Sequence, residues 1–106
     1  MTTPFEELAG LDRLIHEPAR LAIMAALAAC QSADYLFLQR MTGLTGGNLS
    51  SHISKLEEGG LIEVEKRFVD NRPNTQVHIT EAGHKAIELH WQQLENLRRD
   101  SQAWKP

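Results

Sequence analysis

A pair of glycines, Gly59–Gly60, separates two parts of the chain whose apolar residues repeat with different periods. Before the pair, apolar residues recur every three or four positions, which is the period of helices that bury one face. After the pair, Ile62 and Val64 alternate with glutamates, which is the period of a strand with one buried face. Because glycine readily ends a helix, we expect helices before the pair and a strand after it.

Two helices are expected near the N-terminus. Thr3 can cap the first, whose apolar residues keep helical spacing to about His16. Pro18 suits the first turn of a second helix, because proline is tolerated there and not in a helix interior. Apolar residues surround most of this second helix, so we expect it to be the buried one.

Two shorter helices are expected next. Ser32 or Asp34 can cap the first, which spans about residues 34–42 and ends at Gly43, a residue that can adopt the left-handed conformation. Thr45 can cap the second, which continues to the double glycine. Two short helices joined by three residues predict a helix-turn-helix at about residues 34–58.

A β-hairpin and a last helix are expected after the double glycine. Turn-forming residues from Asp70 to Asn74 separate two alternating stretches, which predicts two strands within about residues 61–79. We expect Phe68 to be an inward residue of the first strand. Thr80 can cap a helix over about residues 81–102. The fold class is therefore α+β, mainly helical, with a two-stranded hairpin and long terminal helices.

The size and composition fit one globular domain spanning residues 1–106. A hydrophobic fraction of 42% supports a core, and no apolar run is long enough to cross a bilayer. The acidic N-terminal segment lacks the order of a secretion signal, so we expect a cytoplasmic protein without a membrane partner. Cys30, the single cysteine, excludes an intramolecular disulfide and is expected to be a small buried residue.

Three stretches resemble small bacterial and archaeal winged helix-turn-helix regulators related to the MarR and ArsR groups. Leu11 to Met24 resembles their opening helix pair, and Gly46 to Ile62 resembles their recognition helix leading into the wing. Thr80 to His84 is similar to the Thr-x-x-Gly start of the helix after the wing. The resemblance covers about residues 11–97. It implies a winged helix fold and a sequence-specific transcriptional regulator that binds duplex DNA as a homodimer, without a cofactor.

The segment after Thr45 has the outward face that a recognition helix needs. With Leu49, Ile53 and Leu56 turned to the core, small polar side chains project outward, so the helix can enter a DNA major groove. His52 lies at the boundary between the two faces and is a weaker candidate. The expected DNA contacts of this helix are Thr45, Gly46, Gly47, Asn48, Ser50, Ser51, Ser54 and Lys55.

The hairpin is expected to be the second DNA contact. The resemblance implies that its tip reaches a neighbouring minor groove or the backbone, through Arg67, Asn71 and Arg72. Between Arg40 and Thr75, however, five Lys or Arg residues are balanced by five Asp or Glu residues, and the whole chain has a net charge of −3. Firm DNA binding therefore needs the two faces of a homodimer.

The terminal helices are expected to supply the dimer interface. The helices of the body and the wing already fill a small core, so apolar stripes on the terminal helices are left to pair between subunits. The residues expected there are Phe5, Leu8, Ile15, Trp91, Leu94 and Leu97.

Other functions have weaker support in the sequence. No phosphate-binding loop or catalytic triad motif is present, so we do not expect an enzyme. Glu81, His84 and Glu88 share a helix face, but no Cys pair or compact His pair accompanies them, so no metal site is expected. A small-molecule effector has no recognisable pattern. The main alternative is a winged helix module that binds protein rather than DNA, which the acidic balance favours.

Overall fold

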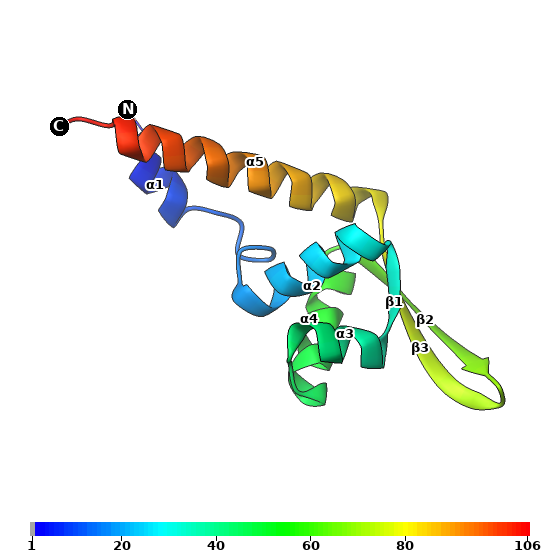
Figure 1. The fold of residues 1–106 in the computed structure, drawn as a ribbon. Coiled ribbons are helices and arrows are strands. Elements are labelled where there is room, and N and C mark those ends of the chain that lie inside the picture. The colour runs from blue at the N-terminus through cyan, green and yellow to red at the C-terminus, as the bar shows by residue number, and fades with distance from the viewer. Residues whose placement is uncertain (1) are drawn as a thin grey trace.

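A computed structural model describes residues 2–106 of the chain. The elements of this part are, in order, α1 (Pro4–Ala9), α2 (Pro18–Cys30), β1 (Ser32–Asp34), α3 (Tyr35–Thr42), α4 (Gly46–Glu58), β2 (Ile62–Val69), β3 (Arg72–Ile79) and α5 (Glu81–Ala103). The molecule is elongated, with extents of 63 × 26 × 21 Å. Helix α5 runs along one side with α1 beneath its C-terminal end, and the β2–β3 hairpin projects from the opposite end (Figure 1).

Side-chain caps start the helices where the sequence predicts them. The hydroxyls of Thr3, Thr45 and Thr80 each accept a hydrogen bond from a backbone N–H in the first turn of α1, α4 and α5, respectively. Asp34 caps α3 in the same way, and Gly43 ends it in the left-handed conformation with φ = 71°. These ends depend on local hydrogen bonds, which explains why the sequence alone located them.

Helix α1 is shorter than expected, because it ends at Ala9 rather than near His16. Residues 11–17 form turns instead, one of them fixed by the Asp12 carboxylate, which accepts a hydrogen bond from the N–H of Leu14 at 3.0 Å. The apolar spacing misled the prediction because Leu11 and Ile15 are indeed buried, at 5% and 3% exposure, but from a turning segment. The turns let the chain pass from α1, which lies beside α5, to the start of α2.

Helix α2 lies at the centre of the core, as its composition predicts. Ile23, Met24 and Leu27 have no exposed surface, and α2 contacts α3, α4, α5 and the sheet. The other fully buried large side chains come from all of these neighbours: Leu38, Leu49, Leu56, Ile62, Val77 and Ile87. Burying each such side chain stabilises the fold by roughly 1.5–3 kcal/mol, so α2 holds the surrounding elements in place.

The sheet has one strand more than the sequence predicts. Its order is β1–β3–β2, all antiparallel, with Ala33 of the short β1 opposite Val77 of β3. Three residues are too few to show a period of two, so β1 gave no pattern to recognise. The hairpin is present as expected, but its turn is shorter than the stretch from Asp70 to Asn74. Val69 pairs with Arg72 across a two-residue turn, so β3 begins at Arg72 rather than Thr75.

That turn requires two residues that tolerate positive φ. Asp70 and Asn71 have φ values of 51° and 63°, the geometry of the type I′ turn that suits the twist of a hairpin. Phe68, expected to point inward, is 76% exposed, because the hairpin continues beyond the body of the protein.

Gly83 allows α5 to cross the base of the hairpin at very short range. A Cβ atom at this position would lie 2.1 Å from the carbonyl oxygen of Leu61 and 2.9 Å from a side-chain carbon of Ile79. No side chain fits there, which gives a packing reason for the Thr-x-x-Gly pattern at the start of α5.

A histidine pair joins the turn region to α5. His16 Nδ1 and His90 Nε2 lie 3.0 Å apart, and His90 is buried at 3% exposure. Burial lowers the pKa of His90 below its ordinary value of 6.5, and the nearby His16 lowers it further, whereas Asp12 acts in the opposite direction.

We expect this buried histidine to make the protein less stable in mild acid. Because its pKa is lowered on folding, the unfolded chain takes up the proton first, so stability is full above the ordinary pKa of about 6.5 and falls as the pH drops through the lowered value. In urea titrations between pH 7.5 and 5.5, His90→Gln should lose less unfolding free energy than the wild type. His84→Gln, at a more exposed position of α5, is the control. An equal loss in the wild type and His90→Gln would contradict the prediction.

Candidate nucleic-acid interface

Helix α4 presents one apolar and one polar face. Leu49, Ile53 and Leu56 are buried against the core. Because successive side chains turn by about 100°, Gly47 and Ser51 point directly away from them. All residues on the outward face are exposed. The helix therefore offers the surface that the sequence predicts.

A groove of about 670 Å³ separates α4 from the hairpin. Of the residues predicted to bind DNA, those on its wall are Gly46, Gly47, Ser50 and Ser54. The hairpin contributes Val64, Lys66 and Thr75 to the opposite wall. Asn48, Ser51 and Lys55 are exposed on α4 outside the groove, and the Thr45 hydroxyl caps the helix. Helix α4 and the hairpin thus form one concave surface.

Tyr35 connects α3 to the groove and was not singled out from the sequence. Its hydroxyl donates to the carbonyl oxygen of Gly46 and lies 2.7 Å from the hydroxyl of Ser50. Because a tyrosine has one hydroxyl proton, Ser50 must donate to Tyr35, which leaves Ser50 free to accept from a ligand. Tyr35 and Ser50 are 15 positions apart, so no local pattern could have revealed the contact.

The two glycines at the start of α4 are not required by the protein itself. A Cβ atom on Gly47 would have no neighbour within 4 Å, and one on Gly46 would meet only the Gln39 side chain, at 3.9 Å. Both helical positions would therefore accept alanine without a clash. The open space beside them belongs to the groove.

The pairing of β2 with β3 assigns each hairpin side chain to a face. Side chains of paired residues share a face, and successive pairs alternate. Lys66 pairs with Thr75, and both line the groove. Arg67 pairs with Asn74 and therefore lies on the far face. Arg67 was expected among the DNA contacts and Lys66 was not, because only the register separates their faces. Arg72 pairs with Val69 and shares the face of Arg67, at the tip of the hairpin.

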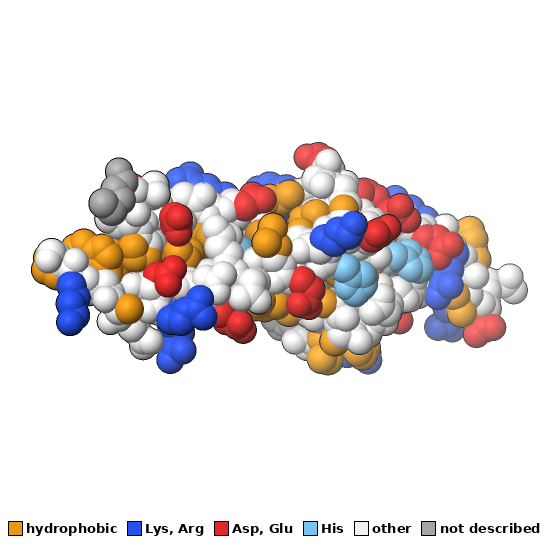
Figure 2. Space-filling view, turned by 90° about the horizontal axis from the view of Figure 1, so that it is seen from above, with side chains coloured by type: hydrophobic (Ala, Val, Ile, Leu, Met, Phe, Trp, Pro, Cys, Tyr) orange, Lys and Arg blue, Asp and Glu red, His pale blue; other side chains and the backbone are white. Residues whose placement is uncertain are grey.

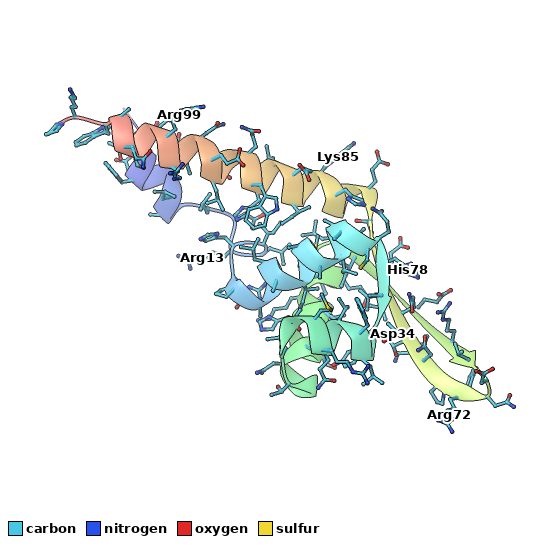
Figure 3. The ribbon with its side chains drawn as sticks, in the orientation of Figure 1. Arg13, Asp34, Arg72, His78, Lys85 and Arg99 are labelled. Atoms are coloured by element: carbon cyan, nitrogen blue, oxygen red, sulfur yellow. The ribbon has the colours of Figure 1, made fainter. Side chains whose placement is uncertain are left out.

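The two arginines of the hairpin differ in their surroundings. Arg67 donates to the side-chain oxygens of Asn74 and Gln76, both at 3.2 Å, and lies 3.9 Å from Glu65. Arg72 lies at the tip beside Asn71, where its side chain extends into solvent (Figure 3). Arg72 is therefore the freer of the two for an external partner.

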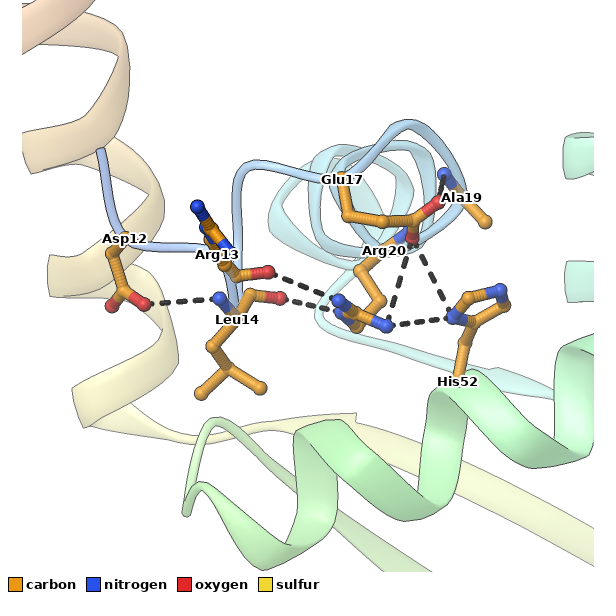
Figure 4. Close-up of polar contacts among 7 residues, drawn as sticks. All are labelled: Asp12, Arg13, Leu14, Glu17, Ala19, Arg20 and His52. Carbon is orange, nitrogen blue, oxygen red and sulfur yellow. Dashed lines mark hydrogen bonds and ion pairs between the residues drawn. The ribbon is translucent and has the colours of Figure 1, made fainter. Parts of the chain in front are cut away.

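Arg20 holds α4 in position from the side away from the hairpin. Its guanidinium donates to the carbonyl oxygens of Leu14 at 2.7 Å and Arg13 at 3.0 Å, and to Nδ1 of His52 on α4 at 3.0 Å (Figure 4). Since arginine cannot accept, Nδ1 of His52 must be the acceptor. His52, a weak candidate for DNA contact, is thus part of an internal contact.

Glu17 completes this cluster. Its carboxylate accepts hydrogen bonds from the N–H groups of Ala19 at 3.1 Å and Arg20 at 2.9 Å at the start of α2. Partial burial by itself would raise the pKa of Glu17, but the two backbone hydrogen bonds and the nearby His52 and Arg20 side chains lower it overall. The carboxylate therefore stays ionised and ties α2 to the cluster.

The residues predicted for a dimer interface are only partly available to a partner. Ile15 and Leu97 are buried within one chain, at 3% and 2% exposure, which corrects the expectation that they lie on an uncovered stripe. Helix α1 packs on α5 and covers part of it. Leu94 is half-buried, whereas Phe5, Leu8 and Trp91 are exposed. Figure 2 shows hydrophobic side chains gathered at the end with α1 and the C-terminus.

Leu89 on α5 was not among the predicted interface residues. It is 69% exposed and lies between two hollows of about 420 and 110 Å³. The larger one is lined by α1 and α5, through Glu7, Gln92, Gln93, Asn96, Leu97 and Asp100. Because the residues around Leu89 are mostly polar, apolar spacing in the sequence did not identify it as an interface residue.

The groove between α4 and the hairpin is not lined by the candidate metal ligands of α5 or by Cys30. Within residues 2–106, no group of three His, Cys, Asp or Glu side chains is arranged to hold a metal ion, and His84 contacts Gln31 at 2.7 Å. Cys30 is exposed rather than buried, since it ends α2 at the surface, and its thiol donates to the carbonyl oxygen of Ala26. None of the helices in this part is long and apolar enough to span a bilayer.

Comparison with known proteins agrees with this geometry. Residues 19–98 match a protein family described as a winged helix DNA-binding domain. A solved structure of a transcriptional regulator homologue from Pyrococcus horikoshii OT3 is 32% identical, with a TM-score of 0.83 over 91% of this chain and 94% of that chain. The matched family region includes both α4 and the hairpin.

Two further proteins are similar over most of the chain. An uncharacterized protein of Methanocaldococcus jannaschii is 28% identical over 88 residues, which are 83% of this chain and 96% of that protein. The structure of a MarR family transcriptional regulator from Silicibacter pomeroyi is 21% identical, with a TM-score of 0.65 over 97% of this chain and 67% of that chain. At 21% identity, the similarity to the Silicibacter pomeroyi structure indicates a shared fold and no more.

We expect Arg20→Met to destabilise the fold. The methionine keeps the apolar stem but leaves the carbonyl oxygens of Arg13 and Leu14 without their donor, which should cost about 1.5–3 kcal/mol in urea unfolding. Arg13→Met removes the same charge from an exposed side chain and is the matched control. Equal stability of the two variants would show that the cluster does not hold α4.

We expect Gly47→Ala to separate stability from duplex binding. Alanine should stabilise α4 by up to about 1 kcal/mol, because it raises helix propensity without a clash. If a duplex enters the groove, the added methyl group should instead weaken binding to it. Thermal unfolding and a DNA titration measure the two effects. A more stable variant with unchanged DNA affinity would mean that no ligand approaches the backbone at Gly47.

Proposed function

Since the chain belongs to the winged helix DNA-binding domain family and is a DNA-binding transcriptional regulator, we propose that it binds its operator as a homodimer with α4 in the major groove. The observation that carries the proposal is the concave surface between the outward face of α4 and the hairpin. Its α4 side carries the small residues Gly46, Gly47, Ser50 and Ser54, which let a helix approach base edges closely, beside Ile53 and Glu57. We refer to the β2–β3 hairpin as the wing.

The N-terminal half of α4 is the end that should enter the major groove. It carries Asn48, whose amide can make two hydrogen bonds to adenine, while Ser51 and Ser54 can contact bases or phosphates. Lys55 can neutralise a phosphate. The exposed acids Glu57 and Glu58 lie at the other end of the helix, where they would repel the backbone if that end entered first. The charge distribution therefore sets the orientation.

The wing supplies the second contact in this proposal. Arg72 and Asn71 lie at its tip, and Lys66 faces the groove, so these side chains can contact phosphates or the minor groove. The contribution of Arg67 is smaller, since its guanidinium is already bonded to Asn74 and Gln76.

The location we propose is the cytoplasm, where the DNA of a bacterium or archaeon lies.

Homodimerisation follows from the charge and the exposed apolar residues. A chain with a net charge of −3 has few cations for the phosphates, and a two-fold dimer doubles them. Leu89 at 69% exposure on α5, with the exposed Phe5 and Leu8 on α1, offers apolar surface on two helices that pack together. Pairing there would leave both α4 helices free and place them about 34–36 Å apart, one turn of DNA.

Selection of bound duplexes from a random pool tests DNA recognition. We expect two related half-sites with this spacing and binding that weakens steeply with salt. Asn48→Ala should lose about 1–3 kcal/mol of discrimination at one base pair per half-site. Failure to bind any duplex would favour the protein-interaction module instead. Its surface would then be the exposed apolar side chains of α3, Leu36, Phe37 and Met41.

We expect Leu89→Glu to split the dimer without unfolding the chain. Leu89 is exposed in the single chain, so the charge should be tolerated there but not at an apolar interface. Sedimentation at micromolar concentration should change from dimer to monomer, with a loss of operator binding and unchanged circular dichroism. Gln102→Glu adds the same charge at another exposed position of α5 and should remain dimeric. A monomeric wild type would overturn the homodimer.

A further inference from the structure

Phe68 on the wing is exposed to an unusual degree. At 76%, its exposure is the highest of any large hydrophobic side chain in residues 2–106. It lies two residues before the Asp70–Asn71 turn and contributes nothing to the core. A phenylalanine in water is unfavourable compared with any polar residue that would serve the same strand. No core contact of Phe68 accounts for its exposed ring. We therefore consider that the ring contacts a ligand.

The register places Phe68 on the DNA-facing side of the wing. Along that face the pairs are Val64 with Val77, Lys66 with Thr75, and Phe68 with Pro73. The first two pairs contribute Val64, Lys66 and Thr75 to the wall of the groove beside α4. Since strands rise about 3.3 Å per residue, Phe68 lies about 7 Å beyond Lys66 along the same face. The ring therefore continues the proposed DNA surface toward the tip.

The charges around Phe68 favour a polyanion as the partner. Between residues 66 and 72 the wing carries three cations and one acid, Asp70. Lys66 shares the face of Phe68, whereas Arg67 and Arg72 lie on the opposite face of the same narrow hairpin. An apolar protein surface would bury Lys66 without a partner, which is costly. DNA offers phosphates for the cations and the faces of bases for the ring.

We propose that Phe68 is an apolar wedge that inserts at a base step in the minor groove beside the α4 site and kinks the duplex there. The proposal rests on the function proposed above. Aromatic and aliphatic wedges of this kind partly unstack the step that they enter. Pyrimidine–purine steps unstack most easily, so Phe68 makes the protein selective for DNA deformability at a position where no hydrogen bond reads the base. Lys66, on the same face of the wing as Phe68, contacts a flanking phosphate.

The test uses the selected operator with 2-aminopurine, a base whose fluorescence rises on unstacking, at successive steps outside each half-site. We expect the wild type to raise the fluorescence at one step per half-site. Phe68→Ala should abolish this rise and weaken binding by about tenfold or more. Phe68→Leu should keep part of both effects. Val69→Ala, on the opposite face of the wing, is the matched control and should behave like the wild type.

The salt dependence separates the wedge from a phosphate contact. Phe68→Ala removes no charge, so its salt slope should equal that of the wild type, whereas Arg72→Ala should lower the slope by about one unit. Unchanged thermal unfolding would confirm that Phe68→Ala is folded, as its exposure predicts.

Three outcomes would overturn the wedge. The wild type could bind the operator without any fluorescence rise, or Phe68→Ala could bind as tightly as the wild type; in both cases the proposed function still stands. Loss of self-association in Phe68→Ala would assign the ring to a protein contact instead. Failure of the wild type to bind any duplex would reject the proposed function itself.

Discussion

The burial of helix α2 is the interaction on which the other elements depend. Ile23, Met24 and Leu27 are fully enclosed by α3, α4, α5 and the sheet, so each of these elements is positioned by its contact with the same helix. A close-packed interior transmits small displacements rather than absorbing them. The angle between α4 and the wing, which defines the groove, is therefore set by a core that no DNA contact touches.

Polar contacts then fix the recognition helix within that frame. Tyr35 holds its first turn through Gly46 and Ser50, and Arg20 holds its middle through His52. Both contacts lie at the edges of the outward face and leave its centre uncommitted. An interface that is organised before binding loses less conformational entropy on binding. This division between supporting and contacting residues explains why polar candidates such as His52 belong to the structure rather than to the ligand surface.

The overall acidity of the chain does not conflict with its class, because the charges are segregated. The acids of α4 lie at its C-terminal end, with Glu57 on the groove wall, and the cations Lys66, Arg67 and Arg72 lie in the outer half of the wing. The net charge of the chain sets the electrostatic potential at long range. Charges in the groove act on a ligand within about 10 Å in physiological salt. In the proposed homodimer, small side chains and the exposed aromatic ring would add to the DNA contact without any charge, so a modest number of cations would be sufficient.

The sequence by itself determined the starts of the capped helices, the approximate place of the turn and the buried face of α4. Caps at Thr3, Asp34, Thr45 and Thr80 and the Asp70–Asn71 turn depend on residues a few positions apart, which a linear pattern contains. Most of the expected contacts on α4 are accordingly exposed where they were expected. Contacts between distant residues were decided only by the tertiary structure. They include the pairing of β1 with β3, the burial of Ile15 and Leu97, the exposure of Cys30, and the cluster around Arg20. The register of the wing, which turns Lys66 and Phe68 toward the groove and Arg67 away from it, also belongs to this group. A period of two shows that the side chains alternate, but only packing against the core selects the face that turns inward.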